Sequence, residues 1–217
     1  MIREILLDEI LEFDQRYRAT FVNSIGGFKS VALIGTKSLS GETNLAIFNS
    51  LFHVGANPPL FGFIVRPDSV ERHTLENILE NNLFTVNHIS ESFYRKAHQT
   101  AARYSKDVSE FGAVGLTEKF ETGFLPPFVK ESKIQIAAEL QQKIDIEMNG
   151  TIMIIALIKS VKLPENCIGA DGFVDLNRAG IVTNSGLDAY YKTIKLGRLT
   201  YAKPDRPVET LPSFLVE

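Results

Sequence analysis

Length, composition and charge describe an ordinary globular protein. The chain has 217 residues, of which 44% are apolar and 23% are charged, and all-β barrels of this length are often single domains. Its net charge of −3 gives no basic field of the kind that nucleic acids or anionic membranes attract. A single cysteine, Cys167, excludes an intramolecular disulfide. We expect one domain over residues 1–217, with its core at about 15–205, in a reducing cytoplasm.

The N-terminal residues 1–13 mix acidic and apolar side chains at helical spacing. This pattern predicts a short amphipathic helix and lacks the basic and apolar regions of a signal peptide. The longest apolar run, residues 152–158, is too short to cross a bilayer. We therefore expect no membrane segment and no membrane partner.

The next segments predict paired strands. Residues 29–36 are rich in β-branched side chains, and residues 39–42 supply the small and polar residues of a turn. Residues 43–48 follow as the returning strand of a hairpin. Residues 60–65 and 83–89 predict two buried strands.

Two helices are predicted beside these strands, at residues 74–82 and 91–104. In the second segment Phe93, Ala97 and Ala101 recur every four residues, which is typical of a helix with one buried face.

A second hairpin is predicted further along the chain. Residues 143–148 alternate polar and apolar side chains, and Asn149-Gly150 is the strongest short hairpin signal, with positive φ expected at both residues. Residues 151–161 must then return antiparallel. Because strands outnumber helices and the clear turns are tight, we expect a mainly β fold, an antiparallel barrel with flanking helices.

The segment from Arg66 to Ile78 leaves a buried strand, carries basic residues and enters a helix at Thr74. Thr74 is a good N-cap, and the N–H groups of the first helical turn lie just beyond it. Arg72 and His73 stand where they could add charge-assisted hydrogen bonds to a phosphate. The pattern predicts a site for a phosphate ester. The alternative is that Thr74 only caps the helix and that the arginines are solvated.

Residues 43–53 predict a strand that breaks into a mixed polar and aromatic run. An irregular strand of this kind can offer backbone hydrogen-bonding groups and an apolar slot to a flat heteroaromatic ring such as a flavin. The alternative is that Phe48 and Phe52 are ordinary core residues. The four histidines form no close helical pair and have no cysteine cluster, so we expect no metal site.

In their order and spacing, these features resemble the flavin reductase-like, FMN-binding split-barrel family, which includes the flavoredoxin-type proteins. The resemblance covers roughly residues 15–205, and each landmark is weak by itself. The landmarks are Val31–Thr36, Gly41, Asn44–Ser50, Asn57-Pro58-Pro59, Arg66, His73–Ile78, Phe84–Asn87, Ser109-Glu110-Phe111, Gly115-Leu116, Gly197-Arg198-Leu199 and Tyr201-Ala202.

The resemblance implies a Greek-key split barrel of about six strands and a homodimer, with one non-covalent FMN per subunit near the dimer interface. In this family the flavin ring meets the backbone at positions that match Asn44, Leu45, Ala46 and Ile47. The phosphate contacts of the family resemble a site made by Ser50, Arg66, Arg72, His73 and Thr74. The sequence departs from the commonest pattern at Phe48-Asn49, where many members carry proline or another small residue before the serine.

The implied activity is that of a flavin reductase or flavin-dependent oxidoreductase, in which hydride passes from NADH or NADPH to FMN and the electrons pass on to an acceptor. Because the flavin supplies the chemistry, we assign no catalytic residue. An alternative within the same fold is a non-catalytic flavin-binding or electron-carrier protein. A third is a relative that has lost flavin and serves as an interaction module.

Overall fold

The computed structural model describes residues 1–67 and 72–211. Its helices are α1 Leu7–Glu12, α2 Gln15–Ile25, α3 His73–Asn81, α4 Tyr94–Gln99, α5 Glu110–Val114 and α6 Leu176–Ala179, with a 3-10 helix at Glu165–Cys167. Its strands are β1 Lys29–Lys37, β2 Thr43–Ala56, β3 Pro59–Val65, β4 Leu83–His88, β5 Glu118–Glu121, β6 Phe124–Val129, β7 Gln135–Ile146, β8 Thr151–Lys162, β9 Val182–Ser185 and β10 Ala189–Lys192.

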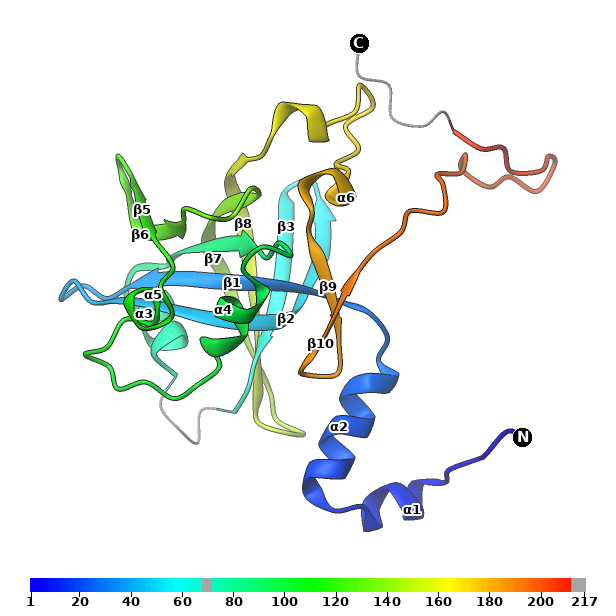
Figure 1. Cartoon of the computed structure of the whole chain (residues 1–217), viewed down its shortest axis with the longest axis horizontal. Helices are drawn as coiled ribbons and strands as arrows, with labels where there is room; N and C mark the ends of the chain where they lie inside the picture. Colours follow the sequence, from blue (N-terminus) through cyan, green and yellow to red (C-terminus); the bar gives the residue numbers. More distant parts are fainter. Residues whose placement is uncertain (68–71, 212–217) are drawn as a thin grey trace.

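A six-stranded antiparallel barrel forms the body of the molecule (Figure 1). The main sheet has the order β10-β9-β1-β2-β3-β8-β7-β4, and an additional pairing of β1 with β4 closes strands β1, β2, β3, β8, β7 and β4 on themselves. Strands β9 and β10 extend one edge, and β5 and β6 form a separate hairpin. The mainly β fold class expected from the sequence is confirmed.

Strand β1 is buried on both faces, which explains its uninterrupted apolar run. Ala32 and Ile34 point into the barrel interior, whereas Val31 and Leu33 pack outside it against α4 and α5. Gly35 allows a close approach on the same strand, because a Cβ there would lie 2.5 Å from the Pro127 carbonyl oxygen. A side chain at position 35 would therefore push β6 away from the barrel.

The first hairpin is confirmed, but its second strand is longer than the sequence predicts. Strands β1 and β2 pair in register from Lys37 and Thr43 onward. The expected break after Phe48 is wrong: β2 continues to Ala56 and absorbs the irregular sequence as register shifts. Polar residues stay inside the strand because they bind neighbours, as the Ser50 hydroxyl does at the backbone of Ile64.

The second hairpin is also confirmed, with a different turn. Strands β7 and β8 pair from Ile146 and Thr151, so four residues connect them. Positive φ occurs at Gly150 (φ 70°) and not at Asn149, whose side chain instead accepts hydrogen bonds from Thr151. The longer connection removes the need for positive φ at both residues.

The two helices predicted beside the barrel have different boundaries in the structure. Helix α3 begins at His73 with Arg72 before it, so Thr74 lies inside the first turn and is not the N-cap. Helix α4 covers only six of the fourteen predicted residues. Successive 3-10 type bonds tighten the chain after Gln99, and the Thr100 hydroxyl donates to the Ala97 carbonyl oxygen, so the chain leaves the helix.

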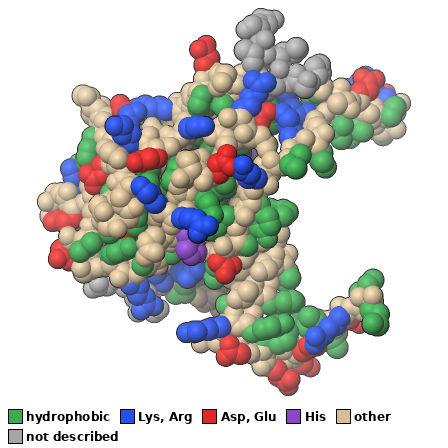
Figure 2. All heavy atoms as spheres, in the orientation of Figure 1, with side chains coloured by type: hydrophobic (Ala, Val, Ile, Leu, Met, Phe, Trp, Pro, Cys, Tyr) green, Lys and Arg blue, Asp and Glu red, His purple; other side chains and the backbone are tan. Residues whose placement is uncertain are grey.

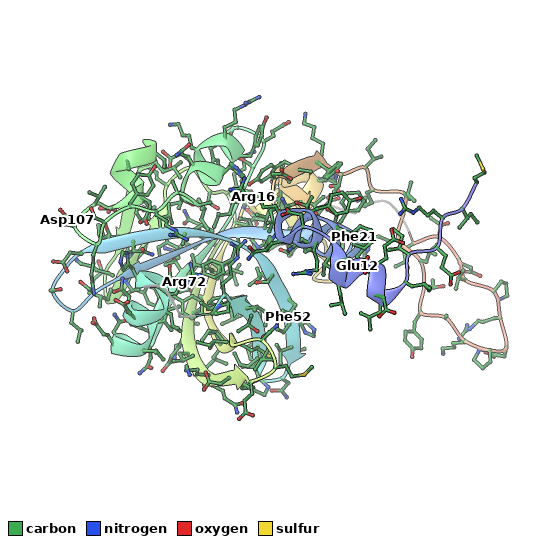
Figure 3. All side chains as sticks on the ribbon, turned by 90° about the horizontal axis from the view of Figure 1, so that it is seen from below. Glu12, Arg16, Phe21, Phe52, Arg72 and Asp107 are labelled. Carbon is green, nitrogen blue, oxygen red and sulfur yellow. The ribbon has the colours of Figure 1, made fainter. Side chains whose placement is uncertain are left out.

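The terminal segments project away from the barrel (Figure 1). Helices α1 and α2 contain no buried residue, and the chain after β10 runs out as an extended arm over residues 193–211. Hydrophobic side chains lie along both projections (Figure 2). Figure 3 shows Glu12, Arg16 and Phe21 on the N-terminal helices, set apart from Arg72 on the barrel. None of the helices in the described ranges has the length and apolar character that crossing a membrane requires.

Candidate functional site

One cavity of about 880 Å³ lies over strand β2. Its floor is the β2 segment from Asn44 to Ser50, without Leu45, together with Val31 of β1. Its walls come from the end of β3, the start of α3, His98 on α4, residues 100–104 after α4, the α5 residue Glu110 and the β9–β10 hairpin. The volume lies near the upper end of the roughly 300–1,000 Å³ typical of small-molecule sites.

The structure brings together almost all the residues that the sequence singled out. Eight of the nine border this cavity: Asn44, Ala46, Ile47, Ser50, Arg66, Arg72, His73 and Thr74. Leu45 does not, because its side chain is fully buried between β2 and the helices α4 and α5. Its backbone N–H donates to the Glu110 carboxylate at 2.9 Å.

Positive charge is concentrated at one side of the cavity. Arg66 follows β3, Arg72 precedes α3, and Arg103 comes from the loop after α4. The Arg72 guanidinium is half-buried, with its Nε donating to the Pro67 carbonyl oxygen at 3.2 Å. Burial, followed by the charges of Arg66 and Arg103, lowers the pKa of Arg72. Three like charges this close are stabilised by an anion with more than one negative charge.

The beginning of helix α3 faces the same space. His73 and Thr74 line the cavity, and the Arg72 side chain before them makes no capping hydrogen bond. The N–H groups of a first helical turn have no partner within the helix, and the helix dipole favours negative charge there. The helix start and the arginines thus have the features of a phosphate site.

Asn44 connects this anion side to the cavity floor. Its Nδ2 donates to the Thr74 hydroxyl at 2.8 Å and to the Thr36 hydroxyl at 3.4 Å, and all three residues are buried. Asn77 of α3 donates to the same Thr36 hydroxyl at 3.1 Å. A buried network of this kind fixes the side chains that it joins. Helix α3 is therefore held against β2 in one position.

The Ser50 hydroxyl is engaged by the backbone. It accepts the Ile64 N–H at 3.0 Å and donates to the Ile64 carbonyl oxygen at 3.1 Å. These bonds fasten β2 to β3 at a register shift. Ser50 borders the cavity, yet its hydroxyl serves the sheet in this structure.

Glu110 is a buried carboxylate at the cavity wall and is absent from the residues that sequence reasoning chose. It is 6% exposed. Burial raises the pKa of its carboxyl group, while the hydrogen bond from Leu45 and the charge of His73 act in the opposite direction. The sequence held one signal for it, the Ser109-Glu110-Phe111 landmark. Glu110 holds the backbone of β2 at Leu45, between the two floor residues Asn44 and Ala46.

Sequence reasoning missed several other cavity residues. They are His98, Arg103, Tyr104, Asp188 and Tyr190. No local motif marks them, because they reach the cavity through the packing of α4 and of the β9–β10 hairpin. No group of three or more potential metal ligands occurs among residues 1–67 and 72–211.

The fold matches those of known proteins. A candidate flavin reductase with a split barrel domain from Shewanella frigidimarina NCIMB 400 shares 46% identity and a TM-score of 0.89, covering 92% of this chain and 100% of that one. Nitrilotriacetate monooxygenase component B from Bacillus cereus has 20% identity and a TM-score of 0.79, covering 92% and 99% of the two chains. An FMN-binding protein from Thermus thermophilus has 15% identity and a TM-score of 0.64, covering 82% and 91%.

Sequence comparison agrees with the structural matches. The first curated relative, an uncharacterised protein from Aquifex aeolicus strain VF5, is 28% identical over 120 residues, 54% of this chain. The chain spans about three fifths of the length of the curated relatives that it matches. The model of the flavin reductase like domain matches residues 28–178, which include the whole barrel. The chain therefore belongs to the flavin reductase-like domain family, and its barrel is the split barrel of that family.

Proposed function

We propose that this protein is an FMN-dependent reductase that takes electrons from NADH or NADPH and passes them to a further acceptor. The observation that carries the proposal is the convergence of Arg66, Arg72 and Arg103 with the start of α3 at one end of a cavity floored by β2. A phosphate monoester is the chemistry that these groups suit. The FMN-binding neighbour with the same fold supports the choice of FMN.

The residues present fit this cofactor. Arg66, Arg72 and Arg103 would hold the phosphate, together with the N–H groups of His73 and Thr74. The floor from Asn44 to Ile47 would face the ring, with its backbone position set by the hydrogen bond from Leu45 to Glu110. When bound, the flavin supplies the redox chemistry between nicotinamide and acceptor. The protein would orient the two ligands over the half-buried floor.

The proposal includes a homodimer and a cytoplasmic location. Helices α1 and α2 and the arm at residues 193–211 carry exposed apolar side chains, among them Leu11 and Leu196. A second copy of the chain is the partner that would cover them, because exposed apolar patches of this kind commonly mark association surfaces. In the cytoplasm the buried thiol of Cys167 would remain reduced.

The visible absorption spectrum tests the proposal. The purified protein is loaded with FMN, desalted and recorded without oxygen before and after NADH or NADPH is added. Retained flavin that loses its colour within seconds supports a reductase. Retained flavin that stays yellow with both donors would contradict the reductase and favour the electron-carrier alternative. Loss of flavin on desalting, with no affinity in a titration, would contradict FMN binding itself.

A further inference from the structure

A hydrogen-bonded aromatic pair stands on the cavity wall away from the arginines. The Nδ1 atom of His98 on α4 lies 3.0 Å from the hydroxyl oxygen of Tyr190 on β10, and both residues line the cavity. Their rings meet edge to face with centroids 5.7 Å apart, and Tyr94 packs against Tyr190 at 5.3 Å. None of these contacts is needed to hold a phosphate.

The order of strands separates the pair from the anion side. Arg66 follows β3 on one side of β2, whereas Tyr190 belongs to β10 on the other side, beyond β1 and β9. With strands about 4.8 Å apart, the four steps from β10 to β3 span roughly 19 Å along the sheet. The end of α4 and the loop after it link the two sides, since His98 lies on α4 and the loop carries Arg103, whose charge acts on Arg72.

The chemistry of the pair suits a flat, neutral heteroaromatic ligand that carries a carbonyl group. Tyr190 presents a half-buried ring and a hydroxyl group, and burial together with the charge of Asp188 raises its pKa to about 12. The phenol thus remains a hydrogen-bond donor at neutral pH. His98 is exposed, and its Nδ1 atom lies within hydrogen-bond distance of the Tyr190 hydroxyl, so it can hold that hydroxyl in place.

We infer that His98 and Tyr190 recognise the nicotinamide ring of the electron donor, with the Tyr190 hydroxyl bonding its carboxamide and His98 positioning that hydroxyl. The inference rests on the proposed reductase function and adds to it the place of the second ligand. The cavity of about 880 Å³ is lined both by the arginines and by His98 and Tyr190, so one space reaches both sides.

The chain offers matched controls for both residues. Tyr191, the next residue in β10, points to the opposite face, where it packs on Phe28 and its hydroxyl accepts a hydrogen bond from Ser185. It does not line the cavity. His53 is an exposed histidine on β2, also outside the cavity.

The test is calorimetric titration of the FMN-loaded protein with NAD⁺, which binds without reaction. Tyr190→Phe and His98→Gln should each weaken NAD⁺ binding roughly three- to tenfold, as expected for the loss of a neutral hydrogen bond. Their combined effect should be smaller than the product of the two, because the residues act as a pair. Tyr191→Phe and His53→Gln should leave the affinity within twofold.

Two further measurements distinguish loss of nicotinamide recognition from general damage to the protein and from failure of the proposed reductase function. The FMN dissociation constant of the variants should stay within twofold of the wild type, while KM for NADH rises and kcat changes less. NAD⁺ affinity that Tyr190→Phe leaves unchanged, in a protein that retains FMN and is reduced by NADH, would overturn this inference alone. A wild-type protein that cannot retain FMN would overturn the proposed function as well.

Discussion

Apolar side chains have opposite surroundings in the barrel and in the terminal segments. Phe63 and Phe84 in the barrel are 0% exposed, whereas Leu196 in the C-terminal arm is fully exposed and Leu11 on α1 is 60% exposed. The barrel closes its own sheet through the β1–β4 pairing, so one chain covers its core. The terminal segments have no such closure. The difference indicates that the stability of the fold comes from the barrel, and the exposed apolar side chains of the terminal segments are the surface through which we propose association.

Removing a ring from the barrel should have the largest effect. Phe84 meets Phe63 and Phe61 edge to face, with centroids 5.6 and 6.2 Å apart. We expect Phe84→Ala to lower the free energy of unfolding by about 3–5 kcal/mol, because it leaves a cavity in a closed core. Urea unfolding at fixed protein concentration measures the change.

A surface phenylalanine provides the control for this loss. Phe120 on β5 is 49% exposed, with the Lys37 ammonium group 5.0 Å from its ring centroid. Phe120→Ala should cost less than about 1 kcal/mol. Equal losses from the two substitutions would show that the barrel interior is not the main source of stability.

Acid should weaken the barrel through His88 at the end of β4. Burial lowers the pKa of His88 from 6.5 to about 4. The unfolded chain therefore binds more protons than the folded chain between these values, so stability falls as the pH drops from about 6.5 to about 4. The loss is at most about 3 to 4 kcal/mol, since one pKa unit is worth about 1.4 kcal/mol.

The free energy of unfolding measured at pH 7, 5.5 and 4.5 would reveal the contribution of His88. His88→Gln should flatten the decline over this range, while His53→Gln, which changes an exposed histidine, should leave it intact. A decline of the same size in His88→Gln would assign the acid sensitivity to other groups.

Arg72→Ala should weaken FMN binding in the cavity without changing the stability of the barrel. A charge-assisted hydrogen bond to phosphate contributes about 1.5–3 kcal/mol, so FMN affinity should fall roughly 10- to 150-fold. The free energy of unfolding without FMN should change little, because removing one of three neighbouring positive charges relieves repulsion. Titration by flavin fluorescence measures the affinity, and the absence of tryptophan simplifies the protein background.

An exposed arginine of the C-terminal arm supplies the matched substitution. Arg206→Ala should leave FMN affinity within twofold, since residue 206 lies outside the cavity. Unchanged affinity in Arg72→Ala would remove Arg72 from the phosphate site.

The barrel was more predictable from the sequence than the site, for a physical reason. Each strand can be recognised from its own residues, as in the apolar run of β1 or the alternation of polar and apolar residues before Asn149. Short turns then show which strands pair with each other. Arg66, Arg72 and Thr74 could be found because one short segment carries them. Arg103 and Tyr190 could not, since they reach the cavity only when α4 and the β9–β10 hairpin pack beside β2.

The two predicted helix boundaries that were wrong have different causes. Thr74 has good N-cap chemistry, but its hydroxyl accepts a hydrogen bond from Asn44, which is distant in sequence. The helix expected to reach Tyr104 stops at Gln99, and the residues that follow border the cavity. At Thr74 a tertiary contact overrides the local preference, whereas local bonds, among them that of the Thr100 hydroxyl to the Ala97 carbonyl oxygen, end α4.

A substitution in the terminal segments should have the smallest effect on the free energy of unfolding and the clearest effect on dimer formation. Helix α1 contains no buried residue, so Leu11→Asp should change the free energy of unfolding of the chain by no more than about 0.5 kcal/mol. If α1 is covered by a second copy, the added charge would be buried there, and the variant should sediment as a 24.2 kDa monomer while the wild type sediments as a dimer. Glu12→Gln on the same helix removes a charge without adding one and should remain dimeric. A Leu11→Asp variant that stays dimeric would place the association surface elsewhere. A wild type that sediments as a monomer would leave the exposed side chains of this helix without the proposed partner.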